Sequence, residues 1–194
     1  MNIELVAKAK LPTIWAEFSI SVFREIESKK EHSVVSLGNL EKDPLLRIHS
    51  QCLTGDTLFS LRCDCGDQLQ LALKIIAQNG KGLLIYMAQE GRGIGLGNKI
   101  KAYELQDQGL NTIEANEKLG FEADQRDYSI CGEILSELGI NGVRLMTNNP
   151  EKVKGLGDSG IEVKERIPLV VEPTEHNKDY LDVKEESMGH MLKE

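Results

Sequence analysis

One uninterrupted apolar run, GLLIYMA at residues 82–88, restricts the fold more than any other stretch of the chain. A short run of this kind is typical of a strand that is buried inside a sheet. The preceding segment, residues 67–78, places four apolar side chains on one helical face, and Asn79-Gly80 then provides a stop signal. A helix that leads directly into a buried strand indicates an α/β core.

Helix and strand patterns continue to alternate through the rest of the chain. Further helices are predicted at 98–109, 126–139 and 149–160, and further strands at 17–25, 32–37, 44–50, 143–147 and 161–167. Because the N-terminal third is strand-rich, we predict an α/β fold with a layered mixed β-sheet and flanking helices. We expect one domain over residues 1–194, with a polar tail from about residue 172 that forms a last surface helix or is partly flexible.

Composition and charge narrow the functional classes. The chain has 40% hydrophobic and 28% charged residues, and no apolar run approaches the roughly 20 residues that span a bilayer. The N-terminus carries no signal-peptide pattern, so we expect a cytoplasmic protein with reduced thiols and no membrane partner. A net charge of −8 argues against a nucleic-acid partner, although a local cluster of Arg and Lys can still bind a small anion.

Three of the four cysteines, Cys52, Cys63 and Cys65, lie within fourteen positions. Because soft thiolates favour Zn²⁺ among the common metals of the cytoplasm, the cluster predicts a zinc site. Three local ligands leave the fourth tetrahedral position open, as in catalytic rather than structural zinc sites. An open site of this kind suits hydrolysis at an electron-poor carbon when an acid or base lies nearby.

Two other interpretations of the cysteines remain open. A fourth ligand, His49 or Cys131, would make the site structural, and scattered buried thiols would bind no metal at all. Cys131 itself lies on the apolar face of a predicted helix, which favours core packing for that residue.

A glycine-rich segment, EGRGIGLGN at residues 90–98, follows the buried strand and opens a helix. Glycines let the backbone approach a ligand closely, and a helix N-terminus presents free N–H groups to an anion. Arg92 and Lys99 add positive charge, although such a segment is often only a connector. Lys152 lies in the first turn of another predicted helix, where a cation is unfavourable unless a bound phosphate relieves the conflict; a solvated lysine is the alternative.

Several motifs occur in one order along the chain: RIHSQCLTGD, RCDCG, QEGRGIGL, KAYELQDQG, ANxxLGF, DxRDY and TNNPxK. Together they resemble the GTP cyclohydrolase II family in its stand-alone form, from Arg47 to the C-terminal MGHML. The resemblance implies a reaction in which GTP and water give 2,5-diamino-6-ribosylamino-4(3H)-pyrimidinone 5′-phosphate, formate and diphosphate. This is the first committed step of riboflavin biosynthesis. It also implies Zn²⁺, Mg²⁺ on the substrate phosphates, and a homodimer.

The resemblance also assigns roles to individual residues. Cys52, Cys63 and Cys65 would hold the zinc ion, whose water would attack C8 of guanine. Tyr103 would assist ring opening, Asp124 would act as a general base, and Arg126 would be the nucleophile at the α-phosphate. A guanidinium stays protonated at ordinary pH, so a charge clamp is the alternative role for Arg126.

The implied GTP contacts lie in several segments. They are Arg47, Ile48, His49, Ser50, Gln51, Gln68, Glu90, Gly91, Arg92, Thr112, Thr147 and Lys152. Two positions depart from the family pattern, because Gln51 replaces the usual Glu and Ala88 replaces a frequent Arg. These departures keep a second hypothesis open: a zinc-stabilised GTP-binding protein that releases only diphosphate or has no activity. The retained cysteines, Tyr103 and Arg126 favour the enzyme.

Overall fold

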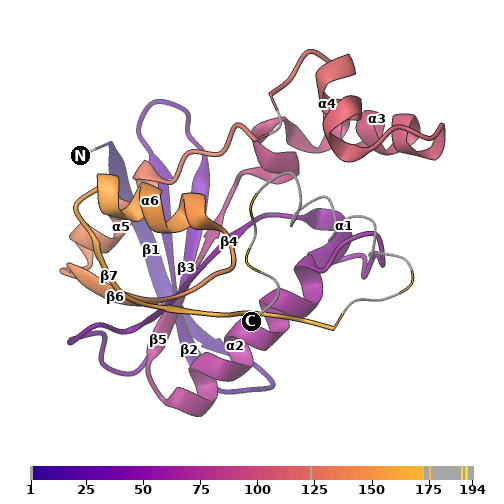
Figure 1. The fold of residues 1–194 in the computed structure, drawn as a ribbon. Helices are drawn as coiled ribbons and strands as arrows, with labels where there is room; N and C mark the ends of the chain where they lie inside the picture. Colours follow the sequence, from indigo (N-terminus) through magenta and orange to yellow (C-terminus); the bar gives the residue numbers. More distant parts are fainter. Residues whose placement is uncertain (1, 123, 173–174, 176–188, 190, 192–194) are drawn as a thin grey trace.

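The computed structural model describes residues 2–122, 124–172, 175, 189 and 191 of the chain. Its centre is a seven-stranded mixed sheet with the strand order β1-β2-β3-β5-β4-β6-β7 (Figure 1). The strands are β1 (Ile3–Pro12), β2 (Glu17–Glu25), β3 (Glu31–Leu37), β4 (Leu45–Ser50), β5 (Gly82–Met87), β6 (Gly142–Met146) and β7 (Glu162–Ile167). The predicted α/β class, with a mixed sheet and a strand-rich N-terminal region, is confirmed.

Strand β5 joins two parts of the sheet with different strand directions. It pairs with β3 in an antiparallel and with β4 in a parallel arrangement. Strands β4, β6 and β7 continue the parallel part. Leu83, Leu84 and Ile85 are at most 1% exposed, which confirms the buried strand. The carboxyl ends of β5, β4 and β6 therefore meet at one edge, where open α/β sheets bind ligands.

Helices cover both faces of the sheet. They are α1 (Leu53–Asp56), α2 (Cys65–Asn79), α3 (Gly95–Asp107), α4 (Thr112–Lys118), α5 (Ser129–Glu137) and α6 (Pro150–Asp158), with a short 3₁₀ helix η1 (Glu90–Gly93). One apolar core includes Ile134 of α5 and Leu156 of α6. A second core includes Ile76 of α2. The α3–α4 lobe, residues 95–118, extends beyond the sheet (Figure 1).

Two predicted helix ends are confirmed by their capping contacts. Gly80 ends α2 in the left-handed conformation, with φ of 73°, a conformation that glycine adopts without strain. Asn149 precedes α6, and its side-chain oxygen accepts a hydrogen bond from the backbone N–H of Glu151 at 2.9 Å. Local capping chemistry was therefore a reliable guide where the capping residue was unambiguous.

Other predicted bounds are wrong, for identifiable reasons. Helix α5 begins at Ser129 rather than 126, because the Asp127 carboxylate accepts the Ser129 N–H at 2.8 Å in a local turn that precedes the helix. Helix α3 begins three residues earlier than predicted, within the glycine-rich segment. Strand β2 contributes to both cores, since Phe18 and Phe23 lie on opposite faces of the sheet. Strand β1 and helices α1 and α4 had no individual prediction.

The expectation for the tail from about residue 172 falls almost entirely outside the described residues. One described tail residue, Met191, donates its backbone N–H to the carbonyl of Asn148 at 2.9 Å. Among the described residues, none of the helices has both the length and the apolar character that crossing a membrane requires.

Candidate active site

A cavity of about 970 Å³ opens at the sheet edge where β4, β5 and β6 end. Pockets of this size accept small-molecule ligands as large as a nucleotide. Its described lining holds six Arg or Lys residues and two acidic ones, although the chain has 23 basic and 31 acidic residues in all. The basic residues are Arg47, Arg62, Arg92, Lys99, Arg126 and Lys152. The cavity is therefore suited to an anion.

The thiol cluster, Cys52, Cys63 and Cys65, forms one wall of this cavity. Its three Sγ atoms lie within 4.8 Å of one another, and those of Cys52 and Cys63 are 3.6 Å apart. All three cysteines are free of disulfides. Hydrogen bonds from Cys63 and Cys65, together with the Lys99 ammonium, lower the pKa of Cys52 below its usual value. The same hydrogen bond to Cys52 raises the pKa of Cys63 to about 11, so the first proton is lost from Cys52. Convergent thiols of this kind are a donor set for a soft divalent metal.

Two glycines leave the space that lets the sulfur atoms converge. A Cβ added to Gly55 would lie 2.7 Å from Sγ of Cys63 and 3.3 Å from Sγ of Cys52. A Cβ added to Gly66 would lie 2.3 Å from the carbonyl oxygen of Gly55. Helix α1 and the start of α2 therefore pack closely enough to bring the sulfurs together only because both residues lack side chains.

Asp56 connects the thiol cluster to the sheet. Its carboxylate accepts hydrogen bonds from the Cys52 backbone N–H at 2.9 Å and from the Tyr86 hydroxyl at 2.7 Å, and lies 3.0 Å from Nε2 of His49. The His49 and Tyr86 rings stack with centroids 5.5 Å apart. Burial lowers the pKa of His49, so the imidazole is neutral at neutral pH. This network fixes the segment that carries Cys52.

Glu90 of η1 and Lys99 of α3 form a second connection, which joins these two helices to the thiol cluster. Nζ of Lys99 donates to Oε1 of Glu90 at 2.8 Å and to Sγ of Cys52 at 3.1 Å. Burial alone would lower the pKa of Lys99, but the hydrogen bonds to Glu90 and Cys52 raise it overall. Lys99 is therefore a buried cation beside the thiol cluster.

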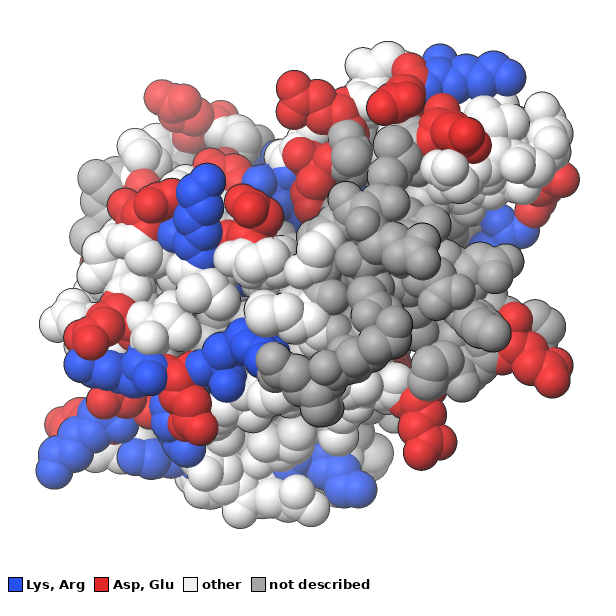
Figure 2. All heavy atoms as spheres, viewed as in Figure 1, with Lys and Arg blue, Asp and Glu red and all other residues white. Residues whose placement is uncertain are grey.

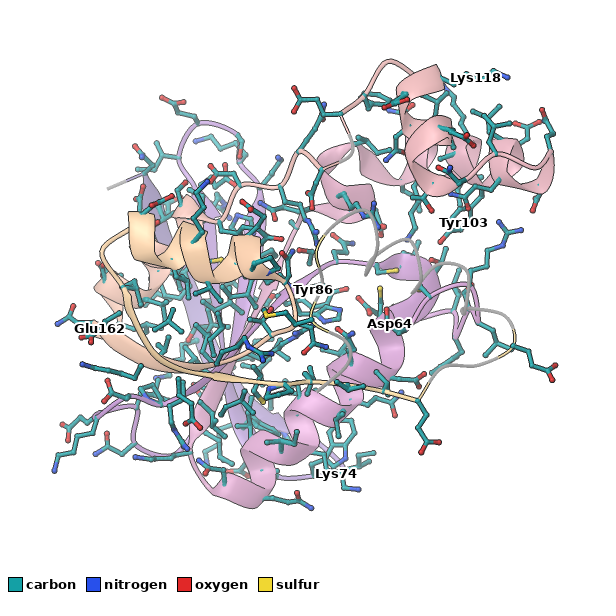
Figure 3. All side chains as sticks on the ribbon, in the orientation of Figure 1. Asp64, Lys74, Tyr86, Tyr103, Lys118 and Glu162 are labelled. Atoms are coloured by element: carbon teal, nitrogen blue, oxygen red, sulfur yellow. The ribbon has the colours of Figure 1, made fainter. Side chains whose placement is uncertain are left out.

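Tyr103 reaches the same place from the α3–α4 lobe. Figure 3 shows its side chain directed from α3 toward α1 and the start of α2, near Asp64. Its hydroxyl lies 3.4 Å from Oγ1 of Thr54, which is itself 3.6 Å from Sγ of Cys52. Burial raises the pKa of Tyr103, so the phenol keeps its proton and can donate a hydrogen bond. The guanidinium of Arg62 lies 4.8 Å from the ring centroid.

Asp124 and Arg126 form a close ion pair on the segment before α5. Nε of Arg126 donates to both carboxylate oxygens of Asp124, at 2.8 and 3.1 Å, and Nη2 donates to Oδ2. Burial alone would raise the pKa of Asp124, but the Arg126 guanidinium lowers it overall. Arg126 lines the cavity, whereas Asp124 is not among the lining residues.

The wall that β4 and β6 supply is held by buried cations. Arg47 donates to the carbonyl of Met146 at 3.0 Å and to the Gln68 side chain, and burial lowers its pKa to about 10. Lys152 is 5% exposed and donates to the carbonyl of Ile48 at 2.8 Å. Its position in the first turn of α6 thus places an ammonium against the end of β4.

Most of the residues predicted for the site lie around this cavity. Those that line it are Arg47, His49, Ser50, Gln51, Cys52, Cys63, Cys65, Gln68, Glu90, Gly91, Arg92, Tyr103, Thr112, Arg126, Thr147 and Lys152. Ile48 differs, because its side chain is fully buried in the core and only its carbonyl faces Lys152. Ala88, the second departure from the family pattern, donates its N–H to Nδ1 of His32.

The suggested fourth metal ligands lie apart from the thiol cluster. Within the described ranges, the group of close metal-binding atoms contains the three cysteines alone. His49 is engaged with Asp56, and Cys131 is fully buried in the apolar core, as predicted for it. Sequence reasoning missed the role of Asp56 as a connector. Its spacing of four residues from Cys52, one helical turn, was the available signal.

The face of the molecule drawn in Figure 2 contrasts with the cavity. On the face in Figure 2, Lys and Arg side chains alternate with Asp and Glu, and the described atoms form no extended patch of one sign. The concentration of positive charge is a property of the cavity lining. A basic lining of this kind is suited to a small anionic ligand.

Comparisons with known proteins show that the chain is similar to GTP cyclohydrolase II over most of its length. A family model described as GTP cyclohydrolase II matches residues 4–168. A protein named GTP cyclohydrolase-2 from Shewanella baltica is 57% identical over 196 residues, covering 100% of this chain and 96% of that protein. Another from Shewanella oneidensis is 55% identical, covering 100% and 97%. A crystal structure of a two-domain 3,4-dihydroxy-2-butanone 4-phosphate synthase from A. baumannii aligns with a TM-score of 0.48 and 19% identity, over 88% of this chain and 41% of that chain.

Proposed function

We propose a function from one premise: the chain belongs to the GTP cyclohydrolase II family of enzymes. It hydrolyses GTP to 2,5-diamino-6-ribosylamino-4(3H)-pyrimidinone 5′-phosphate, formate and diphosphate, which is the first committed step of riboflavin biosynthesis. The observation that carries this proposal is the convergence of three thiols inside a cavity whose lining is mainly basic. A metal-assisted hydrolase of a nucleotide needs a group of metal ligands and a binding place for the phosphates, and this cavity offers both.

Cys52, Cys63 and Cys65 would hold a zinc ion. Their sulfurs converge, and the missing Cβ of Gly55 leaves room for that convergence, so the residues present fit the metal. Three thiolates leave one tetrahedral position unfilled by the described protein groups. Zinc bound there would supply Lewis-acid chemistry for hydrolysis at C8 of guanine.

Tyr103 would hold the reacting ring. Its neutral phenol lies two contacts from the Cys52 sulfur, through Thr54. It can therefore donate a hydrogen bond to an atom of the guanine ring while the ring opens. Gln68 and Glu90 offer amide and carboxylate groups for the polar edge of the base.

The basic wall would bind the triphosphate. Arg92, Arg126 and Lys152 face the cavity from three different segments, η1, the approach to α5, and α6. Thr112, Thr147 and the segment from Arg47 to Gln51 would complete the contacts, with Ile48 contributing through its backbone. Mg²⁺ would bridge phosphate oxygens rather than occupy a carboxylate cage.

Arg126 would act as a charge clamp on the α-phosphate rather than as a nucleophile. The Asp124 carboxylate accepts from Nε and Nη2, which favours the protonated guanidinium and fixes its orientation. Asp124 would then position the Arg126 guanidinium, and as a general base it would first have to leave the ion pair. Removing Arg126 should therefore suppress diphosphate release more strongly than zinc binding.

Incubation of the purified protein with GTP and Mg²⁺, with formate and diphosphate assayed in parallel, tests the proposed reaction. Equal amounts of the two products are expected. Diphosphate without formate would overturn the ring-opening half and direct attention to Gln51 beside the thiol cluster. Bound GTP without either product would favour a zinc-stabilised GTP-binding protein.

Replacing Cys63 by Ser tests the metal site, with Cys131→Ala as the matched control. Cys63→Ser should lose zinc and formate production while the fold persists, because the thiols lie at a cavity wall. Cys131 lies in the core away from the cluster, so its variant should keep its zinc and lose only stability. Unfolding of Cys63→Ser would instead indicate a structural metal. Light scattering of the same samples tests the homodimer that the family resemblance implies.

A further inference from the structure

Lys99 is a buried cation that the proposed reaction does not use. It lies on α3 with 9% of its surface exposed, although α3 belongs to the lobe that extends from the sheet. Its Nζ is 3.1 Å from Sγ of Cys52, 2.8 Å from Oε1 of Glu90 and 5.7 Å from the Tyr103 ring centroid. One ammonium thus contacts a predicted metal ligand, a carboxylate and the face of a predicted catalytic ring.

We propose that Lys99 is a positioning residue of the metal site, which holds the Cys52 sulfur by an N–H···S hydrogen bond and compensates the negative charge of the thiol cluster. The proposal rests on the proposed zinc site. Groups that hydrogen bond to metal ligands orient those ligands and tune the metal that they hold. In this chain the group comes from α3, 47 residues away from the ligand in sequence.

Charge compensation gives the proposal its physical basis. Three thiolates and one divalent cation carry a net negative charge, and Cys52 and Cys63 are largely buried. An uncompensated charge in such a place is unfavourable, whereas an ammonium in hydrogen-bond contact neutralises it. Lys99 supplies such a contact, since its Nζ donates to Sγ of Cys52 at 3.1 Å.

Glu90 holds Lys99 in this place. Oε1 accepts from Lys99 and from the Gly91 N–H at 2.9 Å, and Oε2 accepts from the Leu53 N–H at 2.6 Å. Leu53 follows the metal ligand Cys52 directly, so the carboxylate joins η1, α1 and α3 around one sulfur. The geometry gives Glu90 an orienting function in addition to any contact with the base.

A buried ion pair that only fastens α3 to η1 would explain the same contacts. The two explanations differ in what they predict for the metal. A fastening role changes the free energy of unfolding and leaves the metal environment unchanged. A positioning role changes the electronic state of the Cys52 sulfur, which a bound metal reports.

Cobalt substitution of the full chain separates the explanations. Wild type, Lys99→Met and the exposed same-helix control Lys101→Met are loaded with Co²⁺, and their thiolate-to-cobalt charge-transfer bands are recorded. Zinc affinity is measured on the same proteins by competition with a chromophoric chelator. Lys99→Met should shift the charge-transfer band to lower energy, because an unbonded thiolate gives up its electrons more easily. It should also weaken zinc binding by about 10-fold or more, whereas Lys101→Met should match wild type.

An unshifted band and zinc affinity within about 2-fold of wild type for folded Lys99→Met would overturn the proposal. If that variant does not fold, Glu90→Gln serves instead, since the amide oxygen can still accept from Leu53 while the charged anchor of Lys99 is lost. A smaller shift in the same direction is then expected, and an unchanged band would overturn the proposal. Absence of any thiolate-to-cobalt band in wild type would contradict the proposed metal site itself.

Discussion

The two walls of the cavity are built in different ways. The wall that carries the thiol cluster is formed by the segment between β4 and α2. Both elements are anchored in the apolar cores, β4 by Leu45 and Ile48 and α2 by Ile76. The opposite wall belongs to the α3–α4 lobe, where α3 buries only Lys99 and Ala102. One wall is therefore positioned by the core, and the other by polar contacts across the cavity.

Because the two walls differ in this way, the effect of core packing on the site can be tested separately from the effect of polar contacts. Lys99 to Cys52, Tyr103 to Thr54 and Arg62 to Asp107 all connect the lobe with the thiol segment. Such contacts are directional but individually weak when exposed. Changes in the core-built wall should consequently affect metal and fold. Changes in the lobe should mainly affect turnover, except at Lys99, whose ammonium contacts the Cys52 sulfur directly.

The largest effect is expected from Gly55→Ala. The new Cβ would lie 2.7 Å from the Cys63 sulfur, so the thiol cluster must open and most of the bound zinc should be lost. Metal analysis of the purified variant measures this loss. Gly97→Ala on α3 is the matched control, because its Cβ meets nothing within 4 Å and alanine favours the helix by about 0.5–1 kcal/mol. Full zinc content in Gly55→Ala would contradict the close packing.

A smaller but clear effect is expected from Asp56→Asn. The amide can accept fewer hydrogen bonds than the carboxylate, which serves Cys52, Tyr86 and His49, so the free energy of unfolding should fall by about 1–3 kcal/mol. Urea denaturation measures it. The exposed Asp158→Asn should stay within about 0.5 kcal/mol of wild type. Equal stability of the two variants would show that the connector is dispensable.

The pH dependence of stability tests the Asp124–Arg126 ion pair, which lies on the segment between α4 of the lobe and α5 of the core. The folded pKa of Asp124 is lowered below its ordinary 3.8, so the ion pair with Arg126 contributes stability that is fully present above that value. The contribution is lost as the pH falls through the lowered pKa. The difference in unfolding free energy between wild type and Asp124→Asn should therefore shrink below about pH 4. A difference that stays constant down to pH 2 would be inconsistent with this coupling.

The smallest effect is expected from Arg62→Met in the lobe contact. The guanidinium pairs with Asp107 and stacks on Tyr103, but its side chain is 42% exposed, so stability should change by less than about 1 kcal/mol. We expect kcat for formate release to fall about 2- to 5-fold, because Tyr103 is held less firmly. Asp107→Asn keeps the stacking and should preserve kcat. A larger effect on stability than on turnover would place Arg62 with the core-built wall.

Sequence patterns predicted the elements whose side chains enter a core. The buried strand at 82–88 and the helix at 67–78 have apolar periodicities that burial requires. Strand β1 was not predicted from the sequence because most of its residues are exposed at the sheet edge; Leu5, for example, is 52% exposed. The short helices α1 and α4 lack enough turns to display a period.

The site was predictable where its residues are close in sequence. The spacing of the cysteines indicated a metal site, and the DxRDY motif of the family resemblance pointed to Asp124 and Arg126. The contacts of Lys99 with Cys52 and of Asp56 with Tyr86 join segments that are far apart in sequence. Pairings of this kind depend on strand order, which no local pattern encodes.

The closeness of the three thiols in sequence also has a consequence for assembly. Joining residues 52 and 65 closes a loop of fourteen residues, which takes little conformational entropy and less than about a microsecond in a flexible chain. Lys99 can reach Cys52 only after β5 has entered the sheet and the lobe has docked. If the thiols hold the proposed zinc ion, a nascent chain would be able to bind it before the cavity exists, and docking of the lobe would then enclose the bound ion.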